Sequence, residues 1–440
     1  MKRDPLPGPE VEDLGVLRFL TCGSVDDGKS TLIGRLLYDT KTLLSDTLAT
    51  LHRHAERRGL SAPDLSLLTD GLIAEREQGI TIDVAYRYFA TTRRKFIIAD
   101  SPGHEQYTRN MVTAASTADV AVLLVDAQKG LLPQTKRHAT LAGLLGVRRL
   151  ILAVNKMDRV EWSRSAFEAI VDDFRDWLAK HPDLSDREIS NQLSAVPMSA
   201  LEGDMVVERG EQLPWYDGPT LIDLLEAAPA SQSAVEAPLR LPVQWVCRPS
   251  QDSARAYAGR IEAGRLAVGD EILVLPSGLR SRVTRIAIGT TDLLVAVAGQ
   301  SVLVSLADER DISRGDVLVR VGDVSAVLRQ EIVATVCWLN VRPLATARTC
   351  LLRHATREVK ARVHAIDGRL DIHSLEWTDD QTSPIALNDI ARVRIKTQQP
   401  LVADSYRDLR VTGSFILIDE ATNETVAAGV INSANGEARR

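Results

Sequence analysis

The sequence predicts an α/β domain with a doubly wound, mostly parallel sheet, followed by two small β-barrel domains. In the first half of the chain, short apolar runs alternate with helical patterns, as expected for parallel strands joined by crossover helices. A small, polar, proline-bounded stretch at residues 228–238 is typical of a linker. Beyond it, short apolar runs separated by Gly and Pro indicate compact β-barrels.

The strands of the α/β domain are predicted from its apolar runs, and one of its helices from an amphipathic period. The predicted strands are Val16–Cys22, Lys95–Ala99, Val120–Asp126, Leu150–Asn155 and Ala195–Met198. Between the last two, apolar residues recur every three or four positions, which predicts a helix that packs against the sheet. They are Phe167, Ile170, Val171, Phe174 and Leu178.

The barrel domains are predicted from shorter strands and turn residues. The strands expected in the first barrel include Tyr257–Ile261, Glu271–Leu275 and Ser301–Leu306, and those in the second include Ile332–Cys337, Val359–Ile366 and Val411–Ile418. We place a tail at 1–14, the α/β domain at 15–228, a linker at 229–240, the barrels at 241–328 and 329–433, and a second tail at 434–440.

Composition and charge exclude several functional classes. The 440 residues carry a net charge of −6, which argues against a chain that wraps nucleic acid. The four cysteines show no CxxC spacing, so they predict neither a zinc knuckle nor a disulfide framework. A polar N-terminus and the absence of long apolar runs predict a cytoplasmic protein without membrane contact.

A phosphate-binding loop follows the first predicted strand. The segment from Gly23 to Ser30 fits the GxxxxGK[ST] pattern and precedes a predicted helix at Ser30–Tyr38. Lys29 is expected to neutralise β- and γ-phosphate charge, and the Ser30 hydroxyl to ligate Mg²⁺. The predicted nucleotide contacts in this segment are Gly23, Ser24, Val25, Asp26, Asp27, Gly28, Lys29, Ser30 and Thr31.

Two further loops predict that the base is guanine. Asn155, Lys156, Met157 and Asp158 match the NKxD motif of GTPases and follow a predicted strand, where a doubly wound sheet presents its ligand-binding loops. The Asp158 carboxylate can accept hydrogen bonds from N1–H and the exocyclic amine of guanine, which adenine cannot supply. Ser199, Ala200 and Leu201 resemble the short SAx motif whose backbone contacts guanine O6.

Two segments resemble the switches of translational GTPases. Asp100, Ser101, Pro102 and Gly103 form a DxxG element, in which Asp100 is expected to reach Mg²⁺ through water. Thr81, within Arg76–Ile82, resembles the first-switch threonine near the metal and the attacking water. The resemblance also implies that His104 orients that water. The predicted catalytic residues are therefore His104, Thr81 and Lys29, and the predicted Mg²⁺ ligands are Ser30, Thr81 and, through water, Asp100.

A narrower resemblance covers nearly the whole chain. The segments Gly23–Leu37, Glu75–Phe89, Ala99–Met111, Asp311–Asp316 and Thr412–Asp419 resemble the GTPase subunit of bacterial sulfate adenylyltransferase. This resemblance implies that GTP hydrolysis drives the formation of adenosine 5′-phosphosulfate and pyrophosphate from ATP and sulfate, the entry step of sulfate assimilation. It also implies that ATP and sulfate bind a smaller, ATP-pyrophosphatase-like partner subunit.

The alternatives are a translation-type GTPase that delivers an RNA or release factor and a scaffold that binds GTP without turnover. Elongation factors usually have His where Asp27 stands and Cys where Ser101 stands. Intact Thr81 and His104 argue against the scaffold. The chain has no second P-loop and no SGGxDS or HxGH motif, so we expect neither adenylylsulfate kinase activity nor adenylylation of sulfate by the chain alone.

Overall fold

The computed structural model divides the chain into two compact units, residues 1–230 and 231–440. It describes residues 15–43, 65–68, 84–101, 108–181, 193–229, 234–248, 255–344, 348–371, 374–379 and 383–432, together with Asp46, Ala49, Leu51 and Arg53. Among these residues, no helix combines the length and the apolar character needed to cross a membrane.

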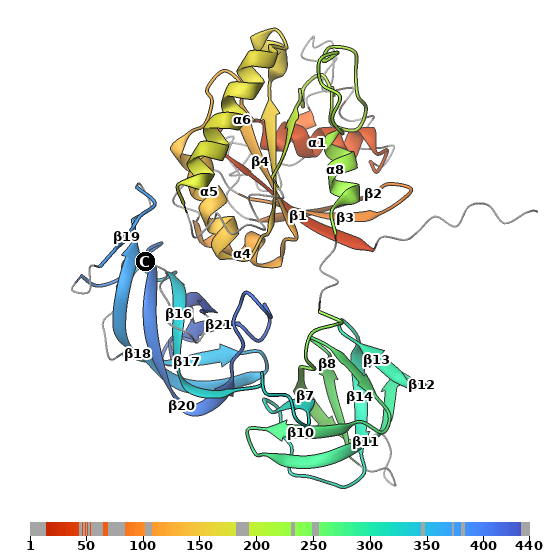
Figure 1. The fold of residues 1–440 in the computed structure, drawn as a ribbon, viewed down its shortest axis with the longest axis vertical. Coiled ribbons are helices and arrows are strands. Elements are labelled where there is room, and N and C mark those ends of the chain that lie inside the picture. The colour runs from red at the N-terminus through yellow and green to blue at the C-terminus, as the bar shows by residue number, and fades with distance from the viewer. Residues whose placement is uncertain are drawn as a thin grey trace, which may run out of the picture. The chain divides into compact units, whose positions relative to one another are not determined.

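The first unit contains a six-stranded sheet in the order β2-β3-β1-β4-β5-β6 (Figure 1). The strands are β1 Val16–Gly23, β2 Ala85–Ala90, β3 Lys95–Asp100, β4 Val120–Asp126, β5 Arg149–Asn155 and β6 Ser194–Pro197. Only β2 is antiparallel to its neighbour. The predicted mostly parallel sheet is therefore confirmed, and each predicted strand is present with ends within one residue.

Helices flank this sheet. They are α1 Lys29–Asp39, α4 Thr108–Thr117, α5 Pro133–Leu144, α6 Arg164–Ala179 and α8 Leu221–Ala227, with short 3-10 turns η1 Leu65–Leu68 and η3 Met157–Val160. Buried leucines of α1 and α8 share one core with Leu17 and Phe19 of β1. In contrast, α4 and α5 pack on each other and contact β1. The amphipathic helix is confirmed as α6, and the Ser163 side chain caps it by accepting from the Ala166 N–H.

The second unit begins with a closed barrel in which six antiparallel strands form the ring β10-β15-β7-β8-β14-β11. Its strands are β7 Leu241–Cys247, β8 Ala256–Arg260, β10 Glu271–Leu275, β11 Leu279–Ile288, β14 Ser301–Leu306 and β15 Val317–Arg320. A short strand, β12 Thr291–Leu293, pairs with β11, while β9 Arg265–Ala267 and β13 Val295–Val297 pair with each other in a separate two-stranded sheet. Pairing of β10 with β11 closes the ring and leaves no open edge among these six strands.

A second six-stranded ring follows in the order β17-β21-β22-β16-β20-β18, closed by pairing of β17 with β18. Its strands are β16 Leu328–Trp338, β17 Thr349–His354, β18 Arg357–Leu370, β20 Ile390–Val402, β21 Ser414–Ile418 and β22 Thr425–Ile431, and β19 Trp377–Thr378 extends it. The two predicted small barrels are thus confirmed.

One predicted strand begins later than its apolar pattern suggested. The sequence predicted Val411–Ile418, but β21 begins at Ser414 and residues 411–413 form a turn. The Thr412 hydroxyl donates to Asp404 and its carbonyl accepts from His354, and both contacts are buried. Gly413 packs so closely on Tyr406 that a Cβ would lie 2.3 Å from the Tyr406 Cα. These buried contacts hold the segment in a turn.

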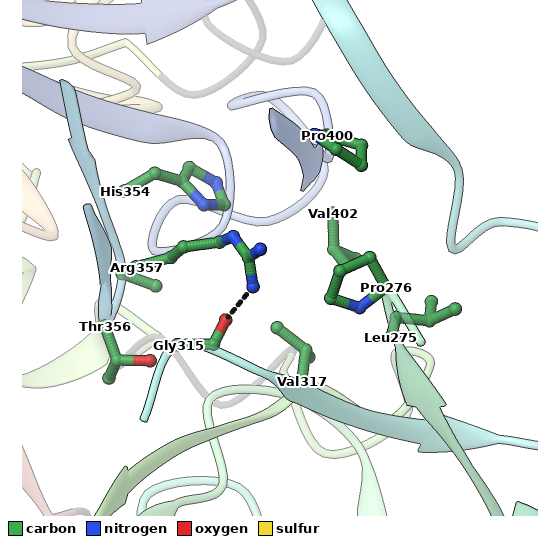
Figure 2. Close-up of a pocket in the computed structure, with 10 residues that line it drawn as sticks. Leu275, Pro276, Gly315, Val317, His354, Thr356, Arg357, Pro400 and Val402 are labelled. Carbon is green, nitrogen blue, oxygen red and sulfur yellow. Dashed lines mark hydrogen bonds between the residues drawn. The ribbon is translucent and has the colours of Figure 1, made fainter. Parts of the chain in front are cut away.

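The two barrels of the second unit contact each other through polar and apolar groups. Arg240 is fully buried, and its guanidinium binds both oxygens of Asp404 at 2.9 and 2.8 Å and Asp323 at 2.6 Å. A small cavity is lined by residues of both barrels, which include Val317 and Val402 (Figure 2). On its wall, Arg357 donates to the carbonyl of Gly315 at 3.4 Å (Figure 2).

Candidate nucleotide-binding site

The predicted phosphate loop connects β1 to α1 at the carboxyl edge of the sheet. Two of its glycines are required by close packing. A Cβ on Gly23 would lie 2.6 Å from the Leu124 carbonyl oxygen, and one on Gly28 would lie 2.4 Å from Asn155 Nδ2. Gly28 also has a φ of 94°, a left-handed conformation that favours glycine. The loop therefore reaches the N-terminus of α1 in a shape that other residues would disrupt.

Lys29 is 7% exposed and is held by the backbone of its own loop. Its Nζ donates to the carbonyl oxygens of Gly23 at 3.1 Å and Ser24 at 2.7 Å. Burial lowers the pKa of Lys29, although the negative charges of Asp100 and Asp27 oppose this shift. A cation held against the loop beside a helix N-terminus creates positive potential suited to phosphate.

Asp27 closes the phosphate loop from within. Its carboxylate is 1% exposed and accepts the Ser24 N–H at 2.6 Å. Burial raises the pKa of Asp27, while the hydrogen bond from Ser24 and the charge of Lys29 oppose the rise. Asp27 therefore shapes the loop, whereas the neighbouring Val25 is only half-buried and Asp26 is exposed.

Asn155 joins the phosphate loop to the two predicted base loops. Its Nδ2 donates to the Asp27 carbonyl at 2.8 Å, and its Oδ1 accepts the Ala200 N–H at 2.9 Å. The side chain is 2% exposed, so both bonds are shielded from water. One amide thus fixes the spacing between loops that follow β1, β5 and β6.

Lys156 lies across the same loops. Its φ is 63°, and its Nζ donates to the Asp26 carbonyl at 2.5 Å and to Asp126 at 2.8 Å. Burial alone would raise the pKa of Asp126, but the hydrogen bonds from Lys156 and from the Gln128 N–H lower it overall. Asp126 is therefore held as a carboxylate at the end of β4.

Asp158 and Ser199, from the two base loops, bind each other directly. The Ser199 hydroxyl donates to Asp158 Oδ1 at 2.7 Å. Arg35 of α1 donates to the carbonyls of Ala200, at 3.1 Å, and Leu201, which ties the last loop to the helix that follows the phosphate loop. Met157 is fully buried and Leu201 is 60% exposed. The arrangement leaves a carboxylate and backbone groups of successive loops at one edge of the sheet.

The first part of the DxxG element lies at the end of β3. The carboxylate of Asp100 is buried and accepts the Thr21 hydroxyl at 3.3 Å, and the Ser101 hydroxyl donates to the Thr21 carbonyl at 2.8 Å. Ser30 and Thr31, at the start of α1, are half-buried. The remaining predicted site residues, Thr81, Pro102, Gly103 and His104, lie outside the described residues.

Three residues of this site were missed by the sequence analysis. Asp126 accepts a hydrogen bond from Lys156, and Arg35 donates to the carbonyls of Ala200 and Leu201. The third, His138 of α5, accepts the Gly23 N–H at 3.1 Å. No local pattern marks these residues, because each contact joins positions at least 30 residues apart.

Three known protein families match successive parts of the chain and show its general class. Residues 15–232 match the Elongation factor Tu GTP binding domain, 256–319 match Elongation factor Tu domain 2, and 331–432 match the GTP-eEF1A C-terminal domain-like family. The fold and the loops described above therefore belong to a GTP-binding protein of the translation-factor class.

Individual relatives narrow the assignment to one family. The chain is 48% identical over 431 residues to Sulfate adenylyltransferase subunit 1 of Laribacter hongkongensis, covering 98% of this chain and 87% of that one. It is 49% identical over 418 residues to the subunit 1 protein of Aeromonas salmonicida, covering 94% and 86%. The Bifunctional enzyme CysN/CysC of Mycobacterium tuberculosis is 49% identical, with 94% of this chain and 67% of that one covered. The chain belongs to the sulfate adenylyltransferase subunit 1 family.

Proposed function

We propose that this chain is the GTP-hydrolysing subunit of a heteromeric sulfate adenylyltransferase, also called ATP sulfurylase. In this role it hydrolyses GTP to drive the formation of adenosine 5′-phosphosulfate and pyrophosphate from ATP and sulfate. The observation that carries the proposal is that Asn155 joins the phosphate loop and the base loops by hydrogen bonds. The 48% sequence identity to a subunit 1 protein supports it.

The phosphate loop supports binding of the nucleotide through its triphosphate. In this proposal Lys29 exchanges its contacts with the Gly23 and Ser24 carbonyls for contacts with β- and γ-phosphate oxygens. The exchange is favourable because burial disfavours the charged form of Lys29, and the negative charge of a phosphate beside it stabilises that form.

The base loops support selection of guanine over adenine. Asp158 Oδ1 is oriented by the Ser199 hydroxyl, so the carboxylate is positioned before the base arrives. In this proposal Asp158 accepts from guanine N1–H and its exocyclic amine, and the backbone of Ser199, Ala200 and Leu201 faces guanine O6. Lys156 and Asn155 tie these loops to the phosphate loop through the carbonyls of Asp26 and Asp27.

The residues near the phosphate loop fit a magnesium ion. The Ser30 hydroxyl and the Asp100 carboxylate are hard oxygen ligands of the kind Mg²⁺ prefers, and Asp100 is buried at the end of β3. We propose that Ser30 and Thr81 ligate the ion and that Asp100 reaches it through water. Mg²⁺, when bound, neutralises charge on the β- and γ-phosphates. His104 is proposed to orient the attacking water.

The partner proposed for this chain is a smaller, ATP-pyrophosphatase-like subunit that binds ATP and sulfate. The subunit 1 designation of the relatives supports an enzyme with more than one subunit. None of the four cysteines, all of which lie in the described part of the chain, forms a disulfide, which supports a reducing, cytoplasmic location.

The proposal is tested by measuring phosphate release from GTP and adenylylsulfate synthesis in parallel. The purified chain alone is expected to hydrolyse GTP slowly and to make no adenylylsulfate. Addition of the smaller subunit, ATP and sulfate is expected to accelerate GTP hydrolysis and to yield adenylylsulfate. GTP turnover that ignores the partner and its substrates, but responds to ribosomes or charged tRNA, would contradict the proposal and favour a translation role.

A further inference from the structure

The phosphate loop is held from outside its own motif by one buried histidine. His138 lies on α5, a helix that contacts β1 and β4, and it is 2% exposed. Its Nδ1 is 3.1 Å from the backbone nitrogen of Gly23, and the two residues are 115 positions apart. Gly23 is both the last residue of β1 and the first of the phosphate loop.

This contact restrains the backbone of Gly23, a residue type whose own conformational preferences are weak. Glycine has the greatest backbone freedom, and Gly23 cannot be replaced by a stiffer residue because of its approach to Leu124. The Gly23 N–H binds His138, and the Gly23 carbonyl accepts from Lys29 Nζ. Before nucleotide binds, the two sides of Gly23 are therefore fixed by different side chains, and rotation of the backbone there would break at least one bond. The bond to His138 is the one that remains when Lys29 turns to the phosphates.

We infer that His138 is a positioning residue for nucleotide binding, because its neutral ring accepts the Gly23 N–H and keeps the phosphate loop in its binding shape. This inference rests on the proposed function of the loop as a nucleotide site. It assigns His138 no contact with the nucleotide itself, since its ring is directed at the loop backbone.

The surroundings of His138 favour the tautomer that this role requires. Burial, together with the charges of Lys29 and Arg137, lowers the pKa of His138 to about 3, so the ring is neutral at neutral pH. Because Nδ1 accepts a hydrogen bond, the ring proton must be on Nε2. The Gln134 side-chain nitrogen lies 3.0 Å from His138 Nε2. The two ends of an amide are interchangeable by a half-turn, and with the oxygen of Gln134 in that place it accepts a hydrogen bond from the Nε2–H.

Three variants separate positioning of the loop from general stability. His138→Leu keeps an apolar side chain of similar size but removes the acceptor. His138→Asn restores an acceptor near the position of Nδ1. Leu141→Ala, at a buried site on the same helix, weakens packing without touching Gly23.

The measurements are the dissociation constants of fluorescent GDP and GTP analogues and the thermal unfolding midpoint without nucleotide. His138→Leu is expected to weaken nucleotide binding about tenfold or more, because an unpaired, buried N–H disfavours the binding shape of the loop. His138→Asn should recover most of the affinity, and Leu141→Ala should lower the midpoint while leaving affinity near the wild-type value.

Two results would overturn the inference. One is a folded His138→Leu variant that binds nucleotide as tightly as the wild type. The other is a loss of affinity in Leu141→Ala equal to that in His138→Leu at the same fall in midpoint. If the wild-type chain binds no guanine nucleotide, the proposed function fails instead, which this assay detects before any variant is compared.

Discussion

Two buried cations, one in each unit of the molecule, have opposite electrostatic surroundings. Burial lowers the pKa of Lys29 in the phosphate loop, where its hydrogen bonds go to two backbone carbonyls. Burial would also lower the pKa of Arg240 in the barrel unit, but hydrogen bonds and charges from Asp404 and Asp323 raise it overall. One cation is left with incomplete charge compensation, and the other is neutralised by carboxylates.

This difference separates a binding site from a structural contact. A buried charge without a paired counter-charge lowers stability, and proteins retain such groups mainly where a ligand supplies the missing partner. The charge of Arg240 is balanced without any ligand, because its guanidinium pairs with Asp404 of the second barrel and with Asp323. The difference agrees with the proposed role of Lys29 in phosphate binding, and it makes Arg240 a contact that holds the two barrels together.

The largest expected effect is on the barrel contact. Arg240→Ala should lower the free energy of unfolding by about 3–5 kcal/mol, because it leaves two carboxylates buried without their counter-charge. The free energy of unfolding is measured by urea titration, with tryptophan fluorescence as the signal. The matched control is Arg248→Ala, whose exposed pair with Glu309 should contribute about 0–1 kcal/mol. Equal losses in the two variants would mean that Arg240 is not the main polar contact between the barrels.

Removing Lys29, the partly compensated cation, should affect binding rather than stability. Lys29→Ala should weaken GTP binding by about 3 kcal/mol, more than 100-fold, because charge-assisted hydrogen bonds to phosphate are lost. Isothermal titration at neutral pH measures the change, with Lys180→Ala, an exposed lysine at the end of α6, as the control. Unchanged affinity in Lys29→Ala would remove this residue from the phosphate site.

The switch residues should affect turnover more than affinity. His104→Ala should reduce GTP hydrolysis by about 10²-fold, the scale expected for loss of a positioned catalytic group. GTP affinity should stay close to the wild-type value, because His104 is assigned to the water and not to the nucleotide. Single-turnover phosphate release, measured beside equilibrium binding, separates the two quantities. Normal hydrolysis by this variant would show that another group orients the water.

The smallest expected effect is a change of base preference. Asp158→Asn should weaken GTP binding by about 2 kcal/mol, roughly 30-fold, and favour xanthosine triphosphate, because the amide donates where xanthine has a carbonyl. The substitution is close in shape, and its Oδ1 can still accept from Ser199. Competition between the two nucleotides gives the preference directly. A retained preference for GTP would exclude Asp158 from contact with the base.

Features that depend on adjacent residues could be predicted from the sequence. The phosphate loop and the NKxD loop were predictable because their chemistry is contained in a few adjacent residues after an apolar strand. Such local patterns also predicted the strands of the first sheet. They did not predict β2, where Arg87 interrupts the apolar residues and Tyr86 and Tyr88 are both exposed.

Contacts between distant residues could not be predicted in the same way. The bond from Gly23 to His138 and the pairing of Arg240 with Asp404 depend on how separate elements pack, across 115 and 164 residues. Ring closure by β10 with β11 and by β17 with β18 likewise depends on the register of whole strands. A histidine in a helix or an arginine in a linker has no sequence signal that names its partner.

The most direct test of the account measures adenylylsulfate made by the reconstituted complex with GTP and with a non-hydrolysable GTP analogue. If GTP hydrolysis drives the reaction, GTP should raise the yield of adenylylsulfate well above the level reached with the analogue, at equal ATP, sulfate and pyrophosphate. Equal yields with the two nucleotides would contradict the account, because nucleotide binding alone would then suffice.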